Sequence, residues 1–336
     1  MAEDGFALGV DVGGTSVKAA LITADGEVVP GTFRIFDPES TKSAHVILGH
    51  FGRALKELIQ AGPRAVGLAF PGPFDYVRGI SQIRGLGKYD DLYGRDLTRD
   101  LHRVLHLGTD TPLRFLNDAV AFGLGEAHFG AARGLRRVLC VTLGTGCGSV
   151  FLVDGAVVTE GQGLPPHGWL YSLPYKGSTL DEVLSRRGLL HLWASAQPAS
   201  TDLDAADLAA RASMDPVAAA VFVRFGEVMA DALAPIVLDF AADAVVVGGR
   251  LAKSAHLFLP ALRRGLAQRG LTTAALQAQD IDGAAVRGAA VAALPNVSFR
   301  PHGTERTDTN PVGSTTALNG NRHDLPNAER TAPDAP

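Results

Sequence analysis

The sequence has little cysteine and no excess of charge of either sign. Its 336 residues include only Cys140 and Cys147, too few for a disulfide scaffold and not spaced like a structural zinc site. With 31 Lys and Arg against 35 Asp and Glu, the formal net charge is -4, which provides no basic surface for nucleic acid or an anionic membrane. We therefore expect no nucleic-acid or membrane partner, and two small buried cysteines in or beside strands.

Long apolar runs and targeting signals are also absent. No segment approaches the ~20 apolar residues of a membrane span, and the N-terminal MAEDG lacks the basic segment and apolar stretch of a secretory signal. We expect a cytoplasmic protein. Apolar residues nevertheless make up 46% of the chain, enough for a large core in one two-lobed unit or two domains.

The last part of the chain differs in composition from the rest. Residues 299–336 are rich in Pro, Gly, Asn, Thr and charged residues, with too little apolar surface to offset the entropy of ordering the chain. This predicts a disordered tail, with an interaction segment as the alternative.

Upstream, strand and helix patterns alternate. Residues 6–12, 16–23 and 27–36 predict a three-stranded meander, in which the Asp25-Gly26 pair supplies the positive φ angles of a hairpin turn. Residues 44–62 have helical apolar spacing up to Gly62-Pro63, which is a helix stop. Further strands are expected at 64–70, 113–118 and 243–249, and helices at 119–130, across much of 203–240 and at about 284–294.

The opening layout occurs twice. Residues 137–158 repeat the order of residues 8–29, which is strand, glycine-rich turn, strand and Asp-Gly turn. A duplicated meander followed by helices predicts two similar α/β lobes that face each other across a cleft. We place the N-terminal lobe at 1–117 and the C-terminal lobe at 118–298, and we expect the last helix to pack back on the N-terminal lobe.

The two glycine turns are candidate oxyanion sites, because bare backbone N–H groups in such turns can converge on one anion. Gly13-Gly14 and Gly144-Thr145-Gly146 are each followed by a strand, so neither is a dinucleotide fingerprint. Residues 249–254 end in Lys-Ser but lack the preceding glycine of a Walker A loop. Two facing turns could clasp the phosphates of one nucleotide, with Thr15 and Thr145 adding hydroxyl donors.

Asp11 precedes the first glycine turn. It could hold Mg²⁺, which keeps most of its waters and is usually bound through one or two carboxylates. The alternative is a turn residue that bonds its own backbone. Asp11 alone does not decide between the two roles, but the second glycine hairpin favours Mg²⁺.

Several motifs, taken in order, resemble a known family. DVGGT at 11–15 with Lys18, and LGTG at 143–146, resemble the two phosphate motifs of the actin and hexokinase superfamily, and VVVGG at 245–249 resembles its adenosine motif. Within that superfamily, Pro71-Gly72-Pro73 followed by Asn117-Asp118 is similar to the ROK family of bacterial sugar kinases and repressors. The resemblance covers roughly residues 6–295.

The resemblance implies an α/β, two-lobed actin-like ATPase fold made of duplicated ribonuclease H-like domains, and a homodimer. It also implies ATP as co-substrate and Mg²⁺ at Asp11. The residues it assigns to the nucleotide are Gly13, Gly14, Thr15, Lys18, Gly144, Thr145, Gly146, Gly248 and Gly249.

The family assigns the aspartate of the Asn-Asp pair as the base for a sugar hydroxyl. Asp118 ends a strand and begins a helix, so its carboxylate can project into the cleft, while Asn117 and Gly72 are expected to contact the sugar. A base of this kind contributes roughly 10²–10⁴ in rate. The alternative for the pair is helix capping, which Asn and Asp do routinely.

The match fails in two places. Many members carry a Glu-x-Gly-His element, which holds the anomeric end of a pyranose, and then a Cys-rich zinc loop. Residues 161–183 contain His167-Gly168 in reversed order and no cysteine, so no structural zinc is expected and the zinc-free branch is the better comparison. Residues 83–89 also lack the family's asparagine.

Other residues of this divergent region have more than one interpretation. His167 is a candidate substrate contact, and Trp169 and Tyr171 are either substrate-wall or packing residues. Asp181 and Glu182 are expected to act in the first turn of a helix.

These observations predict an ATP- and Mg²⁺-dependent kinase for a primary hydroxyl of a hexose or hexose-like polyol, including a carbocyclic analogue (a cyclitol). Another nucleotide or polyphosphate as donor stays open. A family repressor would need an N-terminal helix-turn-helix region, for which we expect no room before the first strand. A catalytically inactive sugar-binding regulator is the alternative, although it would be expected to lose Asp118 or a phosphate motif.

Overall fold

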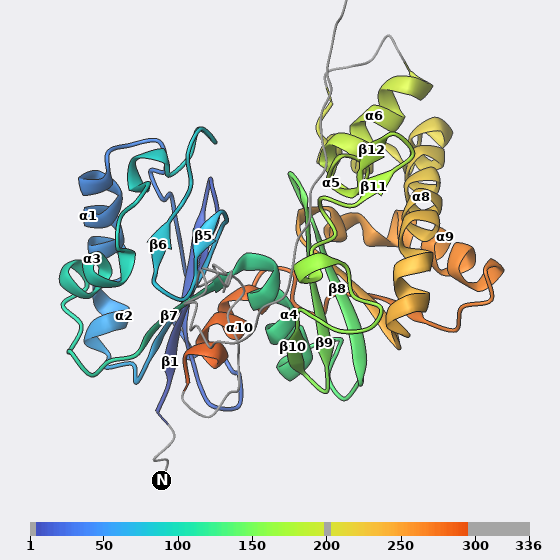
Figure 1. Ribbon diagram of the computed structural model, residues 1–336. Coiled ribbons are helices and arrows are strands. Elements are labelled where there is room, and N and C mark those ends of the chain that lie inside the picture. The colour runs from blue at the N-terminus through green and yellow to red at the C-terminus, as the bar shows by residue number, and fades with distance from the viewer. Residues whose placement is uncertain (1–4, 198–202, 295–336) are drawn as a thin grey trace, which may run out of the picture. The chain divides into compact units, whose positions relative to one another are not determined.

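The computed structural model describes residues 5–197 and 203–294, and the predicted tail lies outside these ranges (Figure 1). The described chain contains two five-stranded mixed sheets with helices around them. Within it, no helix is both long and apolar enough to cross a membrane.

The first sheet has the strand order β3-β2-β1-β4-β7. Strands β1 to β3 form an antiparallel meander, and β4 and β7 continue from β1 in parallel. The strands are β1 (Ala7–Val12), β2 (Val17–Ile22), β3 (Arg34–Phe36), β4 (Val66–Phe70) and β7 (Leu113–Asn117), with a small hairpin of β5 (Phe74–Asp75) and β6 (Ile80–Ser81).

The second sheet has the order β10-β9-β8-β13-β14, which repeats the first strand for strand. Its strands are β8 (Arg137–Leu143), β9 (Cys147–Val153), β10 (Ala156–Val158), β13 (Ala244–Gly248) and β14 (Ala274–Gln277), with a separate hairpin of β11 (Pro174–Tyr175) and β12 (Ser178–Thr179). The predicted duplication of the meander is therefore confirmed.

Helices follow or connect the strands of both halves. They are α1 (Ala44–Ala54), α2 (Lys56–Gln60), α3 (Leu97–Val104), α4 (Asp118–Phe129), α5 (Leu180–Val183), α6 (Arg186–Ala196), α7 (Ala205–Arg211), α8 (Pro216–Phe240), α9 (Ala255–Gln268) and α10 (Ala284–Ala293). Three short 3-10 helices are also described, η1 (Asp90–Leu92), η2 (Pro166–Gly168) and η3 (Arg250–Ser254).

The predicted third strand is largely wrong. Of residues 27–36, only Arg34–Phe36 form β3, and Val28 makes an isolated bridge to Ile22. Pro30 has no N–H for a ladder, and Gly31 turns the chain at φ 76°, so a turn interrupts the segment.

The two Asp-Gly turns also differ. Asp154 and Gly155 both have positive φ, of 50° and 76°, as the tightest hairpin turns require. In the first turn only Gly26 has positive φ, and Thr23 and Glu27 close it through a 2.9 Å backbone hydrogen bond. The prediction that Asp25 shares this conformation is wrong, because the longer turn needs only one left-handed residue.

The helix predicted over 44–62 is divided in two at Leu55, which adopts φ −96° and ψ −1°. Hydrogen bonds still cross the division, from Leu55 N–H to Phe51 O and from Ile59 N–H to Leu55 O, each 3.0 Å. The helix ends before Gly62, which is left-handed at φ 77°, as expected of a glycine C-terminal stop.

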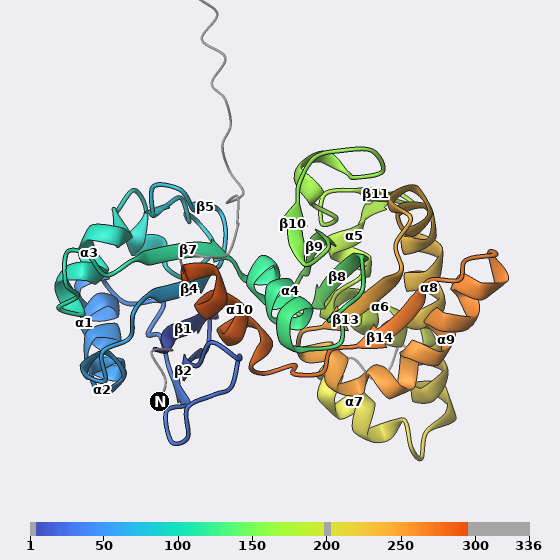
Figure 2. The ribbon, with the colours of Figure 1, turned by 90° about the horizontal axis from the view of Figure 1, so that it is seen from below.

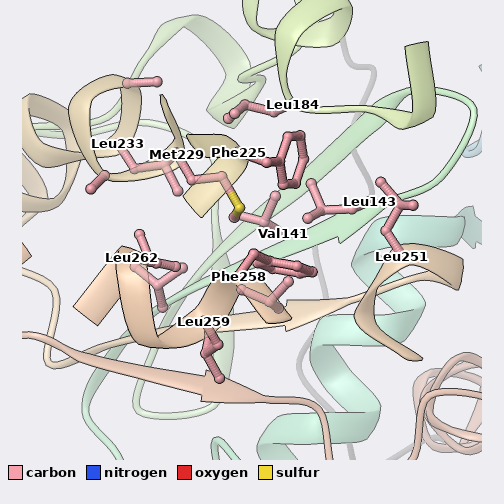
Figure 3. Close-up of a cluster of buried hydrophobic side chains, with 14 of the residues drawn as sticks. Val141, Leu143, Leu184, Phe225, Met229, Leu233, Leu251, Phe258, Leu259 and Leu262 are labelled. Carbon is pink, nitrogen blue, oxygen red and sulfur yellow. The ribbon is translucent and has the colours of Figure 1, made fainter. Parts of the chain in front are cut away.

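The largest buried cluster lies in the second half of the chain. Val141 and Leu143 of β8 lie in one cluster with Phe225 and Met229 of α8 and Phe258 of α9, and the rings of Phe225 and Phe258 pack edge to face with centroids 5.5 Å apart (Figure 3). All five side chains are fully buried. This core holds the strand β8 in place up to the residue before the second glycine turn.

Helix α10 comes last in the described chain, yet it packs on β1 and β4 of the first sheet and along α4 (Figures 1 and 2). Glycines make this approach close. A side chain on Gly67 would collide with the backbone of Ala289, and one on Gly288 with the backbone of Ala121. The sequence of α10 is rich in alanine and glycine because only small residues fit between a sheet and a helix at this distance.

Candidate functional site

The carboxyl ends of three parallel strands meet at one edge of the first sheet. Asp11 of β1 is in register with Ala69 of β4, and Phe70 of β4 is in register with Asn117 of β7. The first glycine turn, the Pro-Gly-Pro turn and the Asn117-Asp118 pair follow β1, β4 and β7 respectively. Ligands of open α/β sheets bind at this kind of edge.

The first glycine turn is held by hydroxyl groups from other segments. Gly13 N–H donates to Ser16 O at 3.0 Å, which closes the turn. The Tyr89 hydroxyl donates to Gly13 O, and the Ser40 hydroxyl donates to Gly14 O, both at 2.7 Å. Two consecutive carbonyls are thereby fixed, while Thr15 is exposed at the tip.

Asp11 is a partly buried carboxylate directly before this turn. Burial raises its pKa from 3.8 to about 6, and the charge of Lys18, its partner across the β1–β2 pair, acts in the opposite direction. The negative charges of Asp118 and Asp282 contribute to this rise. A cation in this place would offset the cost of keeping Asp11 ionised.

Lys18, predicted to bind nucleotide, is engaged with protein. Its Nζ lies 2.8 Å from Asp282 Oδ1, and Lys253 Nζ lies 2.9 Å from Asp282 Oδ2. The two hydrogen bonds from these lysines lower the pKa of Asp282. Asp282 thus joins β2 to η3, which follows the predicted adenosine motif.

Asp118 is the first residue of α4. Its Oδ1 accepts a 2.9 Å hydrogen bond from Ala119 N–H, and part of the residue remains exposed. Desolvation by the surrounding protein raises its pKa, while the Ala119 bond and then the positive charge of Lys88 lower it. Asp118 therefore interacts electrostatically with both Asp11 and Lys88.

Asn117 is the N-cap of α4, so the capping interpretation holds for this residue. Its Oδ1 accepts hydrogen bonds from Ala119 N–H at 2.9 Å and Val120 N–H at 3.4 Å. Its Nδ2 donates to the Tyr76 hydroxyl at 3.3 Å, and that hydroxyl donates to Phe70 O at 3.0 Å. Substrate contact by Asn117 stays a prediction.

Gly72 lies beside the same tyrosine. It is exposed, and a methyl group on it would lie 3.4 Å from the Tyr76 hydroxyl oxygen. Burial raises the pKa of Tyr76 well above its usual range, so the hydroxyl stays neutral and can donate. Tyr76 therefore connects Gly72 to Asn117.

The second glycine turn lies between β8 and β9. Gly144 N–H donates to Gly146 O at 3.0 Å, and Gly144 O accepts from Arg186 N–H at 2.8 Å. Thr145 is exposed. Asp181 supports this turn, because its Oδ1 accepts from Cys147 N–H at 2.8 Å.

The helix start predicted near Asp181 and Glu182 is present. Both residues lie in the first turn of α5, and Thr179 is the N-cap, accepting from Glu182 N–H at 3.4 Å. Asp181 does more than this position suggests, since Arg187 Nη2 also lies 2.5 Å from its Oδ2. The position of Asp181 in the sequence did not indicate its hydrogen bond to Cys147 N–H, next to the glycine turn.

Gly248 and Gly249 are required by close packing. Gly248 is buried, and a side chain there would collide with the ring of Phe122 on α4. Gly249 has φ 78°, and a methyl group on it would lie 2.5 Å from Leu143 O. Gly249 therefore allows the end of β13 to lie against the start of the second glycine turn.

His167 is an exposed residue of η2 with a left-handed backbone at φ 56°. Within residues 5–197 and 203–294, no hydrogen bond or ion pair joins it to Asp118, Asn117 or Gly72. Trp169 and Tyr171 follow it with ring centroids 6.0 Å apart. Its role as a substrate contact stays a prediction.

The sequence profile of the ROK family matches residues 7–295. The chain belongs to the ROK family. Among curated relatives, the glucokinase of Thermotoga maritima is 31% identical over 159 residues, which are 47% of this chain and 47% of that protein. The N-acetylgalactosamine kinase AgaK of a Shewanella species is 27% identical over 308 residues, 84% of this chain and 95% of that protein.

The comparison with solved structures gives the fold. A ROK family glucokinase from Streptomyces griseus, in complex with glucose and AMPPNP, matches with a TM-score of 0.70 at 23% identity, covering 86% of this chain and 99% of that one. The predicted two-lobed, actin-like α/β fold of ROK proteins is thus confirmed.

The site of this ROK protein suits Mg²⁺. Among the residues that the structure describes, no group of three His, Cys, Asp or Glu side chains is arranged to hold a metal. Mg²⁺ does not require one, since one or two carboxylates, waters and substrate phosphates complete its coordination. Asp11, with its raised pKa, fits as the protein ligand. The expected lack of structural zinc stays a prediction.

Sequence reasoning missed four residues of the site, Ser40, Tyr76, Lys88 and Tyr89. None of the four lies in a glycine turn. Each instead contacts a glycine turn, or the strand that leads into it, from another part of the chain. The predicted buried state of the two cysteines, in contrast, is confirmed, since Cys140 lies in β8 and Cys147 begins β9.

Proposed function

We propose that this ROK protein is an ATP-dependent kinase that phosphorylates a primary hydroxyl of a hexose or hexose-like polyol. The observation that carries the proposal is that Asp118, directly after β7, lies at the sheet edge that bears Asp11 and the first glycine turn, and interacts electrostatically with Asp11 and Lys88. The similarity to a glucokinase and to an N-acetylgalactosamine kinase supports a sugar acceptor.

In this reaction Asp118 is the general base. An alcohol is a poor nucleophile at neutral pH, so Asp118 accepts the hydroxyl proton as the alcohol oxygen bonds to the γ-phosphorus and the bond to the β–γ bridging oxygen breaks. ADP leaves with the electron pair of the broken bond. Such a base contributes roughly 10²–10⁴ in rate, or about 3–5 kcal/mol.

The glycine turns hold the phosphates in this proposal. Gly13, Gly14 and Thr15 bind from the first lobe, Gly144, Thr145 and Gly146 from the second, and Gly248 and Gly249 lie near the adenosine. Asp11 holds Mg²⁺, which neutralises phosphate charge when bound. In this proposal the chain has an N-terminal lobe at 1–117 and a C-terminal lobe at 118–298. The protein is cytoplasmic, forms a homodimer and binds no nucleic acid.

The region around His167 is the reason why the proposed acceptors include compounds other than hexoses. ROK members with a Glu-x-Gly-His element hold the anomeric end of a pyranose through it, whereas this chain has Pro165-Pro166-His167-Gly168-Trp169. A site without those hydrogen-bonding groups does not penalise a ring that lacks an anomeric oxygen. Cyclitols with a primary hydroxyl therefore belong to the proposed acceptors.

The test is an ADP-release assay with ATP and Mg²⁺ over glucose, mannose, amino and N-acetylated sugars, and cyclitols, with mass spectrometry of the product. We expect turnover of at least one acceptor, and Asp118→Asn should lower it at least a hundredfold while ATP binding persists. Asp25→Asn, in the exposed hairpin turn, is the matched control. No phosphorylated product from any acceptor, with sugar binding retained, would instead favour an inactive regulator.

A further inference from the structure

Lys88 lies over the first glycine turn. A methyl group built on Gly14 would be 2.9 Å from Lys88 Cδ and 3.5 Å from its Nζ. The lysine side chain thus occupies the space above Gly14 that a side chain would need. This contact joins two segments that are far apart in the sequence, and it brings an ammonium group to the backbone proposed to bind phosphate.

The backbone that carries Lys88 is firmly held on both sides. Before it, Leu86 N–H and Gly87 N–H donate to the two carboxylate oxygens of Asp90 at 3.0 and 2.9 Å. After it, Tyr89 is fully buried, and its N–H donates to Ser40 O at 2.6 Å. Lys88 is therefore placed by its neighbours, unlike a lysine on a freely moving surface loop.

The ammonium group of Lys88 forms no salt bridge in the described parts of the chain. Lys18, the other lysine near the turn, is instead 2.8 Å from Asp282. Of these two cations, Lys88 is the one that can approach a phosphate without first breaking an ion pair.

Lys88 also interacts electrostatically with the proposed base. Its positive charge is the one that lowers the pKa of Asp118, against the opposing effect of desolvation. A single cation is thus near both the phosphate-binding backbone and the group that accepts the acceptor's proton. The transferred phosphoryl group must pass between these two, because it moves from the nucleotide to the hydroxyl that Asp118 faces.

We propose that Lys88 is a further catalytic residue, whose ammonium group contacts the oxygens of the γ-phosphoryl group during transfer. The inference rests on the proposed function. Lys88 keeps its proton throughout, while Asp118 takes the hydroxyl proton, the new oxygen–phosphorus bond forms and ADP departs. Preorganised charge of this kind acts where negative charge is concentrated in the transition state.

The first test compares Lys88→Met and Lys88→Arg with Lys56→Met, a control at an exposed lysine of α2. We expect Lys88→Met to lower kcat about a hundredfold, with KM for the acceptor changed less than threefold, and Lys88→Arg to recover part of the loss. The acidic limb of the kcat/KM profile should move to higher pH in Lys88→Met, because Asp118 loses a neighbouring cation. Unchanged kcat and an unmoved limb would overturn the proposal.

The second test needs no acceptor. Calorimetric titration should show that Lys88→Met weakens the binding of AMPPNP with Mg²⁺ about tenfold but changes ADP binding less than twofold, since only AMPPNP has a γ-phosphate. Equal weakening of both nucleotides would place Lys88 in a merely structural role and overturn the proposal. If wild-type protein phosphorylates nothing, the proposed function fails, and this titration still decides the contact of Lys88.

Discussion

The Tyr89 hydroxyl donates a 2.7 Å hydrogen bond to the carbonyl oxygen of Gly13, across 76 positions of sequence. Tyr89 is fully buried, and burial raises its pKa well above its usual range, with further increases from the charges of Asp11 and Asp37. The phenol is therefore always a donor. This bond fixes the orientation of the peptide group that begins the first glycine turn, before any nucleotide arrives.

We predict that Tyr89→Phe weakens ATP binding. The lost hydrogen bond contributes about 0.5–1.5 kcal/mol, which corresponds to roughly a two- to tenfold rise in the dissociation constant if the turn must be ordered before binding. Calorimetric titration with AMPPNP measures it. The control is Tyr93→Phe, because the Tyr93 side chain is half exposed and its ring lies under the guanidinium group of Arg84. Equal affinities of the two variants for AMPPNP would show that the Tyr89 hydroxyl does not order the turn for nucleotide binding.

Much of the fold could be predicted from the sequence, because the meander is specified locally and occurs twice. Apolar alternation and the Asp-Gly turns set β8, β9 and β10, and the comparison of the two copies identified the duplication. The third strand failed where Pro30 and Gly31 interrupt an otherwise strand-like run. The prediction was wrong because the β-forming residues of this segment lie on both sides of Pro30 and Gly31, which break a strand.

The site was only partly predictable. Asp11, Asp118 and the glycines were predicted as site residues because each is part of a short motif. Tyr89 and Lys88 were not, although both lie in the loop noted for its missing asparagine, since their roles depend on which segment the loop contacts. Lys18 illustrates the same limit, because a motif cannot show that its lysine is paired with Asp282, 264 positions away.

That ion pair leads to a prediction about Lys18. If Lys18 contacts phosphate, it must first leave Asp282, so Asp282→Asn should tighten ATP binding about threefold. Stability should change by less than about 1 kcal/mol, because exposed ion pairs contribute little and the Asp282 side chain is 54% exposed. AMPPNP titration and a thermal melt measure the two effects. Weaker binding in Asp282→Asn would mean that Asp282 positions Lys18 for the nucleotide instead of competing for it.

A pH-dependent stability is expected from Asp11. Its pKa rises from 3.8 to about 6 on folding, so between these values the folded state holds a proton that the unfolded chain has lost. Stability from this group therefore falls as pH rises from about 4 to 6, and above pH 6 the cost reaches about 3 kcal/mol at most. Asp11→Asn should raise the melting temperature at pH 7.5, and the gain should shrink as the pH falls through this window.

Asp11→Asn should also change the Mg²⁺ dependence of the activity. If Asp11 holds the ion, Asp11→Asn must raise the Mg²⁺ concentration needed for half-maximal activity, while chelation by EDTA abolishes activity of the wild type. A more stable protein with an unchanged Mg²⁺ titration would return Asp11 to the role of a turn residue. Greater stability together with weaker metal use would show that the buried charge is kept for function at a cost in folding.

The packing of α10 gives a stability prediction that is independent of the chemistry. Gly288 faces the backbone of Ala121 on α4, where an added methyl group has no space, so Gly288→Ala should destabilise by about 1–3 kcal/mol through overpacking. Gly49→Ala is the matched control within α1, because its methyl group would meet only Arg53 Nη1, at 3.5 Å. There the better helix propensity of alanine should stabilise by up to about 1 kcal/mol. Thermal melts of the two variants should therefore shift in opposite directions, and a shift of the same sign in both would show that α10 does not lie as close to α4 as Gly288 allows.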